Sequence, residues 1–187
     1  MSAASGQPGR YQRSSSGMVG ALLATLLVIA AFVALRACNR TDLQVEPEHV
    51  DYLSQVGFAQ QAGDRVVYPA SLPSGWYATQ LSVDPGQPTG LQLSMLTDNN
   101  AYVGFVQSPD SAPVLLTRYV DAAPASAGPA DVPGAVDGAV TRWDVWTDDG
   151  GDTALVARHG AETLLVFGTA SRSQLEQLAG RLTTARL

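Results

Sequence analysis

The sequence predicts an α+β protein in which a single N-terminal transmembrane helix precedes an antiparallel β-sheet of about seven strands, flanked by two or three helices. Three observations lead to this prediction. A long apolar run without charge lies near the N-terminus. Most of the chain after it alternates apolar and polar residues in short segments separated by turns, which is typical of strands. Apolar residues spaced three or four apart indicate a helix before the strands, one between them and one at the end.

The apolar run is "MVGALLATLLVIAAFVAL" (18–35), in which no residue is charged and Thr25 has the only polar side chain. As a helix it is about 27 Å long, close to the thickness of the hydrocarbon core of a bilayer. A helix also satisfies its own backbone hydrogen bonds, as lipid requires. The alternative is the core helix of a soluble domain, but such a helix usually keeps a polar face, and this run has none. We therefore expect residues 18–35 to cross the membrane.

The orientation of this helix is argued from its flanks, because cytoplasmic flanks are enriched in basic residues. Arg10 and Arg13 precede the run and Arg36 and Arg40 follow it, so the count is tied. The small size of the N-terminal tail favours a cytoplasmic N-terminus. The predicted organisation is a disordered cytoplasmic tail (1–17), a transmembrane helix (18–35) in the plasma membrane, a juxtamembrane linker (36–48) and an extracytoplasmic α+β domain (49–187).

Cys38 raises an alternative to a permanent membrane helix. The sequence "LRAC" has the leucine and the alanine that a bacterial lipoprotein cleavage site requires before its cysteine. Arg36 departs from that pattern, and the apolar run is long for the core of a signal peptide, which spans about 7–15 residues. Lipidation at Cys38 and an incidental thiol beside the head groups both stay open, and both place the domain outside the membrane.

Composition excludes some partners and some forms of stabilisation. Residues 41–187 carry seven arginines and all seventeen acidic residues of the chain, a net charge of −10. Such a surface repels nucleic acid, whose binding requires basic residues to displace condensed counterions, so we expect no nucleic-acid partner. The single cysteine cannot form an intramolecular disulfide. The domain must therefore rely on its core.

A helix is expected at the start of the domain. Pro47 suits a first helical turn, Val50, Leu53 and Val56 recur at a spacing of three, and Gly63 is a typical stop.

Strands dominate the chain after Gly63. A short helix at 111–120, with Ser111 as its N-cap and Pro113 in its first turn, interrupts them. The segment 121–138 is rich in Ala, Pro and Gly, and we expect a flexible surface loop there. The predicted strands cover residues 65–70, 76–83, 91–96, 101–108, 139–147, 153–158 and 163–170.

The last helix begins after Ser171, with Gln174 at the capping-box position, and Leu175, Leu178 and Leu182 are expected on its apolar face. Short hairpin loops imply antiparallel strands, because parallel strands need longer crossovers. The expected packing is one antiparallel sheet with helices covering its apolar face.

The chain contains no recognisable catalytic or metal-binding motif. The two histidines, His49 and His159, lack ligand-spaced neighbours, and His159 is expected in a turn at a strand end. The sequence "DDGGD" (148–152) resembles part of a calcium loop but lacks its final glutamate, so a hairpin turn is favoured. Nucleophile elbows and phosphate-binding glycine loops are also missing. We therefore predict no enzymatic activity, no cofactor and no metal, although two carboxylates of a hydrolase can meet in the fold without leaving a motif.

The tryptophans are the remaining lead to a site. In the strand at 139–147, Trp143 and Trp146 lie on opposite faces, so one of them should be in the core. Trp146 shares its face with Arg142 and Asp144, and we predict that these three residues form a partner or ligand surface. The alternative is that helices or the 121–138 segment cover the second tryptophan.

Several stretches of the chain together resemble an uncharacterised actinobacterial family, domain of unknown function 4245. The membrane helix, "YPASLPSGWYATQLSV", "LQLSMLTDNNAYVGFVQS", "WDVWTDDGGDTALVARHGAETLLVFGTAS" and "QLEQLAGRL" carry the resemblance, which extends from Met18 to Leu182. The "LP-x-GW" turn and the "GTAS" step are its most specific parts. The resemblance implies a one-pass envelope protein of Gram-positive, high-GC bacteria, and it implies no activity or catalytic residue.

These observations predict a single-pass membrane protein whose extracytoplasmic domain is a non-catalytic binding module for an unknown protein or ligand of the cell envelope. An envelope hydrolase is the first alternative. An accessory or sensor subunit of a membrane complex is the second.

Overall fold

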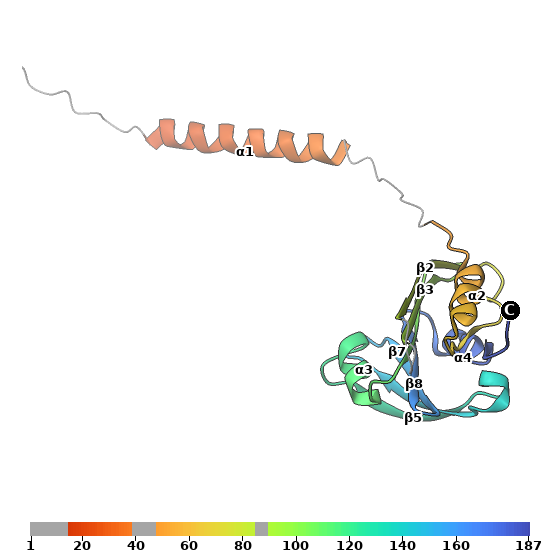
Figure 1. Ribbon diagram of the computed structural model, residues 1–187. Helices are drawn as coiled ribbons and strands as arrows, with labels where there is room; N and C mark the ends of the chain where they lie inside the picture. Colours follow the sequence, from red (N-terminus) through yellow and green to blue (C-terminus); the bar gives the residue numbers. More distant parts are fainter. Residues whose placement is uncertain (1–14, 39–47, 85–89) are drawn as a thin grey trace, which may run out of the picture. The chain divides into compact units, whose positions relative to one another are not determined.

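The computed structural model describes residues 15–38, 48–84 and 90–187 (Figure 1). The chain divides into two compact units, Met1–Glu46 and Pro47–Leu187. In the described residues, the first unit contains one helix and the second contains all of the strands.

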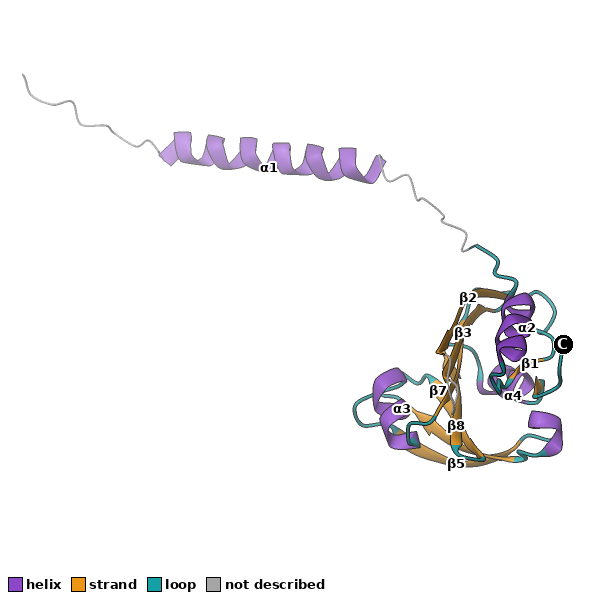
Figure 2. Ribbon diagram, viewed as in Figure 1, coloured by secondary structure: helices purple, strands orange, loops and turns teal. Residues whose placement is uncertain are grey.

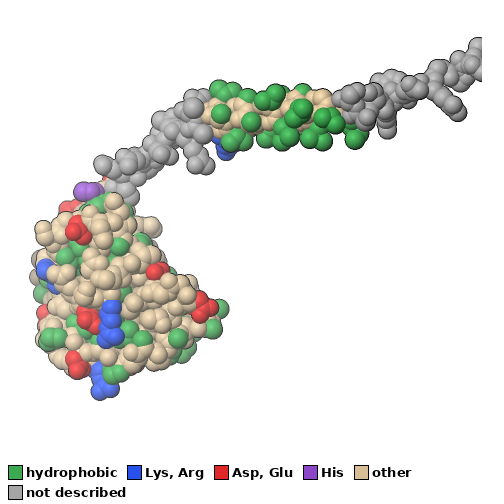
Figure 3. All heavy atoms as spheres, turned by 180° about the vertical axis from the view of Figure 1, so that it is seen from behind, with side chains coloured by type: hydrophobic (Ala, Val, Ile, Leu, Met, Phe, Trp, Pro, Cys, Tyr) green, Lys and Arg blue, Asp and Glu red, His purple; other side chains and the backbone are tan. Residues whose placement is uncertain are grey.

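Helix α1 spans Ser15–Cys38 and is longer than the predicted helix by three residues at each end. From Gly17 to Arg36 every described side chain is exposed, and the mean hydropathy is 2.7. Apolar side chains cover α1 along its length (Figure 3). Thr25 donates its hydroxyl to the carbonyl of Ala21 at 2.9 Å, so its one polar side chain is satisfied within the helix. By length and composition α1 is able to cross a membrane.

The second unit is built on a seven-stranded sheet with the spatial order β2-β3-β4-β8-β7-β6-β5. Every strand pair in it is antiparallel, which confirms the predicted α+β class. A separate two-stranded sheet pairs β1 with β9. The strands are β1 Tyr68–Pro69, β2 Tyr77–Asp84, β3 Gly90–Leu96, β4 Tyr102–Ser108, β5 Ala125–Asp131, β6 Arg142–Thr147, β7 Thr153–His159, β8 Glu162–Gly168 and β9 Leu182–Thr183.

Helices cover both faces of the sheet, as Figure 2 shows. Helices α2 (Tyr52–Ala62) and α4 (Arg172–Ala179) pack on one face and enclose the large core, which contains Phe105 and Trp143. Helix α3 (Ala112–Tyr119) packs on the other face, against β7 and β8, and encloses a small core around Leu116. The expectation that helices cover one apolar face is confirmed for the large core, and the small core adds a second covered face.

Helix α2 begins later than its sequence pattern predicts. Asp51 caps it by accepting hydrogen bonds from the backbone and the hydroxyl of Ser54. The backbone N–H of Val50 is bonded to the carbonyl of Ala78 in β2, at 2.9 Å, and so is not available to a helix. The predicted start at Pro47 is therefore wrong for residues 48–51, and Pro47 itself lies outside the described residues. The predicted stop at Gly63 is confirmed: its φ of +99° is the left-handed conformation of a helix C-cap.

The predicted loop at 121–138 is wrong, because it contains β5 and a 3₁₀ helix, η1 (Ala135–Gly138). Strand β5 lies at one edge of the sheet, opposite β2, and in the described residues its one partner strand is β6. An edge strand tolerates a proline such as Pro129, because one side of it needs no hydrogen-bond partner. Ala130 and Val136 are buried in the large core. The small side chains of this segment give no local sign of a strand, and pairing with β6 determines it.

The ends of two predicted elements also differ from the structure. The strand expected at 65–70 is reduced to Tyr68–Pro69, paired with Leu182–Thr183. Leu182 was expected on the last helix, but α4 ends at Ala179 and Leu182 lies in β9, 1% exposed. Both positions bury Leu182, so the spacing of apolar residues does not distinguish them. The capping box of Ser171 and Gln174 is confirmed.

Candidate functional site

A cleft of about 740 Å³ opens in the second unit between three segments. They are the end of α2 with the residues that follow it (60–67), the hairpin between β7 and β8, and the C-terminal segment around 184–186. We call it the α2–hairpin cleft. Its volume falls in the range of about 300–1,000 Å³ that is typical of small-molecule sites.

Gln107 lies behind this cleft and holds two of its walls together. Strand alternation places Gln107 on the large-core face with Phe105, and it is 1% exposed. Its Oε1 accepts the N–H of Val67 at 2.6 Å, and its Nε2 donates to the carbonyl of Arg65 at 2.8 Å and to Oε2 of Glu162 at 2.6 Å. Both amide hydrogens are used, so this buried group is satisfied. The Glu162 carboxylate is thereby held by an uncharged amide.

The β7–β8 hairpin, which forms the second wall, has a two-residue turn that is stabilised by hydrogen bonds from Arg158. His159 and Glu162 are paired across it, and Gly160 adopts a φ of +60°, which a two-residue hairpin turn requires at this position. On the opposite face, Arg158 donates to the hydroxyl of Thr163 and to the carbonyl of Ala161, at 3.0 and 3.1 Å. These bonds fix the turn that carries His159 and Glu162.

The C-terminal segment is fastened beside the cleft by residues from three elements. Gln60 of α2 donates to the carbonyl of Ala185 at 2.8 Å and accepts the N–H of Leu187 at 3.0 Å. The hydroxyl of Tyr68 donates to the same Ala185 carbonyl, and burial raises the pKa of Tyr68. Asp137 accepts bonds from Thr183 and from the backbone and hydroxyl of Thr184. The backbone bond from Thr184 is the main cause of the lowered pKa of Asp137.

The charged groups of the cleft are of both signs. Arg65, Arg186 and Glu162 line it together with Asp64 and the imidazole of His159. Among the described residues, neither guanidinium group has an ion-pair or hydrogen-bond partner, and Glu162 is bonded only to Gln107. The site therefore offers two cationic groups and one positioned carboxylate oxygen to a ligand.

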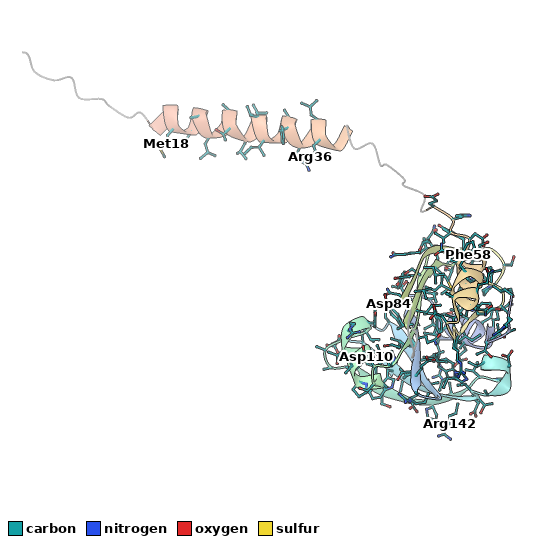
Figure 4. The ribbon with its side chains drawn as sticks, in the orientation of Figure 1. Met18, Arg36, Phe58, Asp84, Asp110 and Arg142 are labelled. Atoms are coloured by element: carbon teal, nitrogen blue, oxygen red, sulfur yellow. The ribbon has the colours of Figure 1, made fainter. Side chains whose placement is uncertain are left out.

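The surface predicted around Trp146 lies elsewhere, on β6. Trp143 is fully buried in the large core, and Trp146 is half-buried at the margin of the small core. Arg142 and Asp144 are exposed on the same face of β6, and Arg142 points away from the sheet in Figure 4. The structure thus brings the three residues into one row. The clefts described here are lined by other residues.

The other residues singled out in the sequence are placed as follows. Cys38 is the last residue of α1, and its side chain lies outside the described part of the chain, so its lipidation stays a prediction. His49 stacks on Tyr77 with ring centroids 4.1 Å apart. Within 15–38, 48–84 and 90–187, no group of three or more His, Cys, Asp or Glu side chains comes together as a metal site.

The "DDGGD" segment is a hairpin turn between β6 and β7, as predicted. The backbone N–H of Asp152 donates to Oδ1 of Asp148 at 2.7 Å, and Gly151 adopts a φ of +91°.

A second cleft, of about 300 Å³, lies on the α3 side of the sheet and contains carboxylates. Asp84 of β2 and Asp110, which precedes α3, line it together with Arg118 (Figure 4). Nη1 of Arg118 donates to Oδ2 of Asp110 at 2.8 Å, and this bond raises the pKa of Arg118. One of the two carboxylates is therefore already engaged by a cation.

Sequence reasoning missed the α2–hairpin cleft, although one signal for it was available. Gln107 follows Val103 and Phe105 at a spacing of two, so a polar amide is placed on an apolar face. Buried polar groups need hydrogen-bond partners, and this residue therefore marks a point where other polar groups converge. Arg65 and Arg186 carried no such signal, because 121 positions separate them in the chain.

Comparison with known proteins gives one family. Neither the curated proteins nor the solved structures contain a match to this chain. The model of the family described as protein of unknown function (DUF4245) matches residues 10–182, nearly the whole chain, including α1, the sheet and α4. The chain therefore belongs to the DUF4245 family.

Proposed function

We propose that this protein is a membrane-anchored, non-catalytic binding domain of the cell envelope. The observation that carries the proposal is the α2–hairpin cleft, in which Arg65, Arg186 and Glu162 have no partner ion among the residues that the structure describes. Charged groups left unpaired at a concave site favour a ligand that pairs with them. Binding of a ligand at this cleft requires no catalytic group, and one membrane helix is enough to anchor the domain.

The anchor in this proposal is α1. Every described side chain from Gly17 to Arg36 is exposed, and apolar side chains exposed to this extent favour an apolar solvent. We place the N-terminus in the cytoplasm and the folded unit outside, because the residues before α1 include Arg10 and Arg13 and no acid.

Membrane extraction tests the anchor. The protein is expected to remain with membranes washed in alkaline carbonate. The variant Leu27→Arg/Ile29→Arg should be released, because each arginine at the centre of a membrane helix costs about 2.5–3.5 kcal/mol on insertion scales. Release of the unaltered protein by carbonate would contradict an integral anchor.

The sidedness has its own test, since the chain has one cysteine. In a Cys38→Ser background, Ala123→Cys introduces a thiol at an exposed position of the folded unit. A membrane-impermeant maleimide should label it in intact cells. Labelling only after the cells are lysed would place the folded unit in the cytoplasm.

Binding is tested by photo-crosslinking in native membranes. A crosslinker placed at exposed Ala161, beside the cleft, should capture a reproducible envelope component. The capture should be lost in Arg65→Ala/Arg186→Ala and kept in Arg172→Ala, which removes an exposed arginine that does not line the cleft. Equal capture by all three proteins would contradict a binding role for the cleft.

The specific observation in favour of a hydrolase is the pair Asp84 and Asp110 in the α3-side cleft. Arg118 already binds Oδ2 of Asp110, at 2.8 Å, so this oxygen is not free to act on a substrate. Cleavage of envelope polysaccharide by the purified protein, abolished in Asp110→Asn, would replace the binding proposal with this one.

A further inference from the structure

We propose that the α2–hairpin cleft binds a zwitterionic ligand of the amino-acid or short-peptide class. Its carboxylate would lie on Arg65 and Arg186, and its ammonium group would lie on Glu162. This inference rests on the binding function proposed above and names the chemistry of the ligand.

The arginines of the folded unit supply the first argument. Four of the seven use their guanidinium groups on other parts of the protein: Arg118 on Asp110, Arg158 on Thr163 and Ala161, Arg172 on Glu176, and Arg181 on Ser71. The other three are Arg65, Arg142 and Arg186, which have no such partner among the described residues. Two of these three line one cleft. In a region with a net charge of −10, two arginines without partner acids at one site favour an anionic group as their ligand.

The geometry of Glu162 supplies the second argument. Gln107 bonds only Oε2 of this carboxylate, so Oε1 has no partner among the described residues. The amide that holds Oε2 is buried and uncharged, and therefore it positions the carboxylate without neutralising it. A positioned, unneutralised carboxylate favours a cationic donor, and a charge-assisted hydrogen bond to it is stronger than a neutral one.

Together these groups select against ligands of a single charge. A phosphate or a simple carboxylate is attracted by the two arginines but repelled by Glu162. A simple amine is attracted by Glu162 but repelled by the two arginines. A zwitterion satisfies both ends at once. A cleft of about 740 Å³ has room for a dipeptide or for the end of a longer peptide.

The test is a titration of the full-length protein in detergent, followed by calorimetry or by ligand-detected NMR. The probes are L-alanyl-L-alanine, acetate, methylamine and inorganic phosphate. We expect the dipeptide to bind at least about tenfold more tightly than any probe of a single charge, since it makes one more charge-assisted contact.

Two variants and a matched control locate the binding. Glu162→Gln removes the charge and keeps the shape of the side chain, and Arg186→Ala removes a cation from the opposite wall. Each should weaken dipeptide binding about tenfold or more. Arg172→Ala removes an exposed arginine of α4 that does not line the cleft, and it should leave dipeptide binding unchanged. Thermal unfolding of each variant reports whether the fold is retained, and Arg65→Gln provides a second cation variant if Arg186→Ala unfolds.

The outcomes separate the two proposals. If phosphate or acetate binds as tightly as the dipeptide, or if Glu162→Gln has no effect, the zwitterion inference is wrong. Absence of dipeptide binding also overturns it. Should cleft-dependent crosslinking in membranes persist in that case, the binding function stands with a ligand of another class. The loss of both signals would reject both proposals.

Discussion

The central strands of the sheet and its edge strand β5 differ in composition and in how much of their side chains is buried. Strands β4, β8 and β7 lie between the large core and the small core, so both of their faces are buried. Strand β5 has five exposed residues out of seven and pairs on one side only. Burial on two faces demands a close fit at every position. The edge instead requires a backbone that pairs with β6, and it leaves freedom in its side chains.

The largest expected effect is at a glycine in the centre. Gly168 ends β8 with a φ of +144°, and a Cβ added there would lie 2.1 Å from the carbonyl oxygen of Tyr102. Gly168→Ala combines backbone strain with displacement of β4, and we expect a loss of about 4 kcal/mol or more in the free energy of unfolding. Urea denaturation followed by tryptophan fluorescence measures it.

Gly128 at the edge provides the control. It also has a positive φ, +85°, but an added Cβ would meet no atom within 4 Å. Gly128→Ala should cost only the backbone strain, about 1–2 kcal/mol. Similar losses in the two variants would contradict the distinction between centre and edge.

The second prediction compares the two faces of a single strand, β6. Trp143→Ala empties a fully buried site in the large core and should cost about 3–5 kcal/mol. Trp146→Ala removes a half-buried side chain and should cost clearly less. Differential scanning calorimetry of both variants tests this order, and the reverse order would contradict the assignment of Trp143 to the core.

Trp143 also permits a sharper comparison. Its indole N–H is buried without a hydrogen-bond partner in the described structure. Trp143→Phe removes this unpaired donor while it keeps most of the apolar volume, so the two effects oppose each other. We expect a change within about 1.5 kcal/mol, which the same calorimetry detects.

The same contrast explains how much of the fold follows from sequence. The apolar run "TLLVF" of β8 and the alternating "LQLSML" of β3 contain large apolar side chains that mark them as buried strands. Their bounds are predicted within about two residues. Strand β5, "ASAGPAD", has no large apolar side chain, so nothing local marks it as a strand. Its pairing with β6 comes from tertiary structure. Local propensity cannot reveal an element that its neighbour specifies.

The candidate site shows the same limit more strongly. Arg142, Asp144 and Trp146 were found because strand alternation places near neighbours on one face. The α2–hairpin cleft joins Arg65, Glu162 and Arg186, which come from three distant parts of the chain. Only the polar residue on an apolar face, Gln107, gave a local sign of it.

Gln107 gives the third prediction. Gln107→Leu would leave the Val67 N–H and the Glu162 carboxylate without their partner, and we expect a loss of about 1–3 kcal/mol. Within the described part of the chain, the side chain of Gln92 in the adjacent β3 makes one long hydrogen bond, accepted from Tyr119 at 3.4 Å, so Gln92→Leu should change stability by less than about 0.5 kcal/mol. Chemical denaturation of both variants measures the difference. Equal losses would show that the buried amide is no more important than the half-buried one.

The last prediction concerns alkaline pH, where Tyr52 connects α2 to β1. Its hydroxyl donates to the carbonyl of Pro69 at 2.9 Å, and burial raises its pKa to about 12. Because the unfolded chain ionises this tyrosine near pH 10, the protonated phenol stabilises the fold fully below about pH 10. That stability is lost as the pH rises toward 12. The midpoint of urea unfolding should fall over this range, and Tyr52→Phe should reduce the slope. An unchanged slope in Tyr52→Phe would mean that the phenol is not held in its protonated form by the packing of α2.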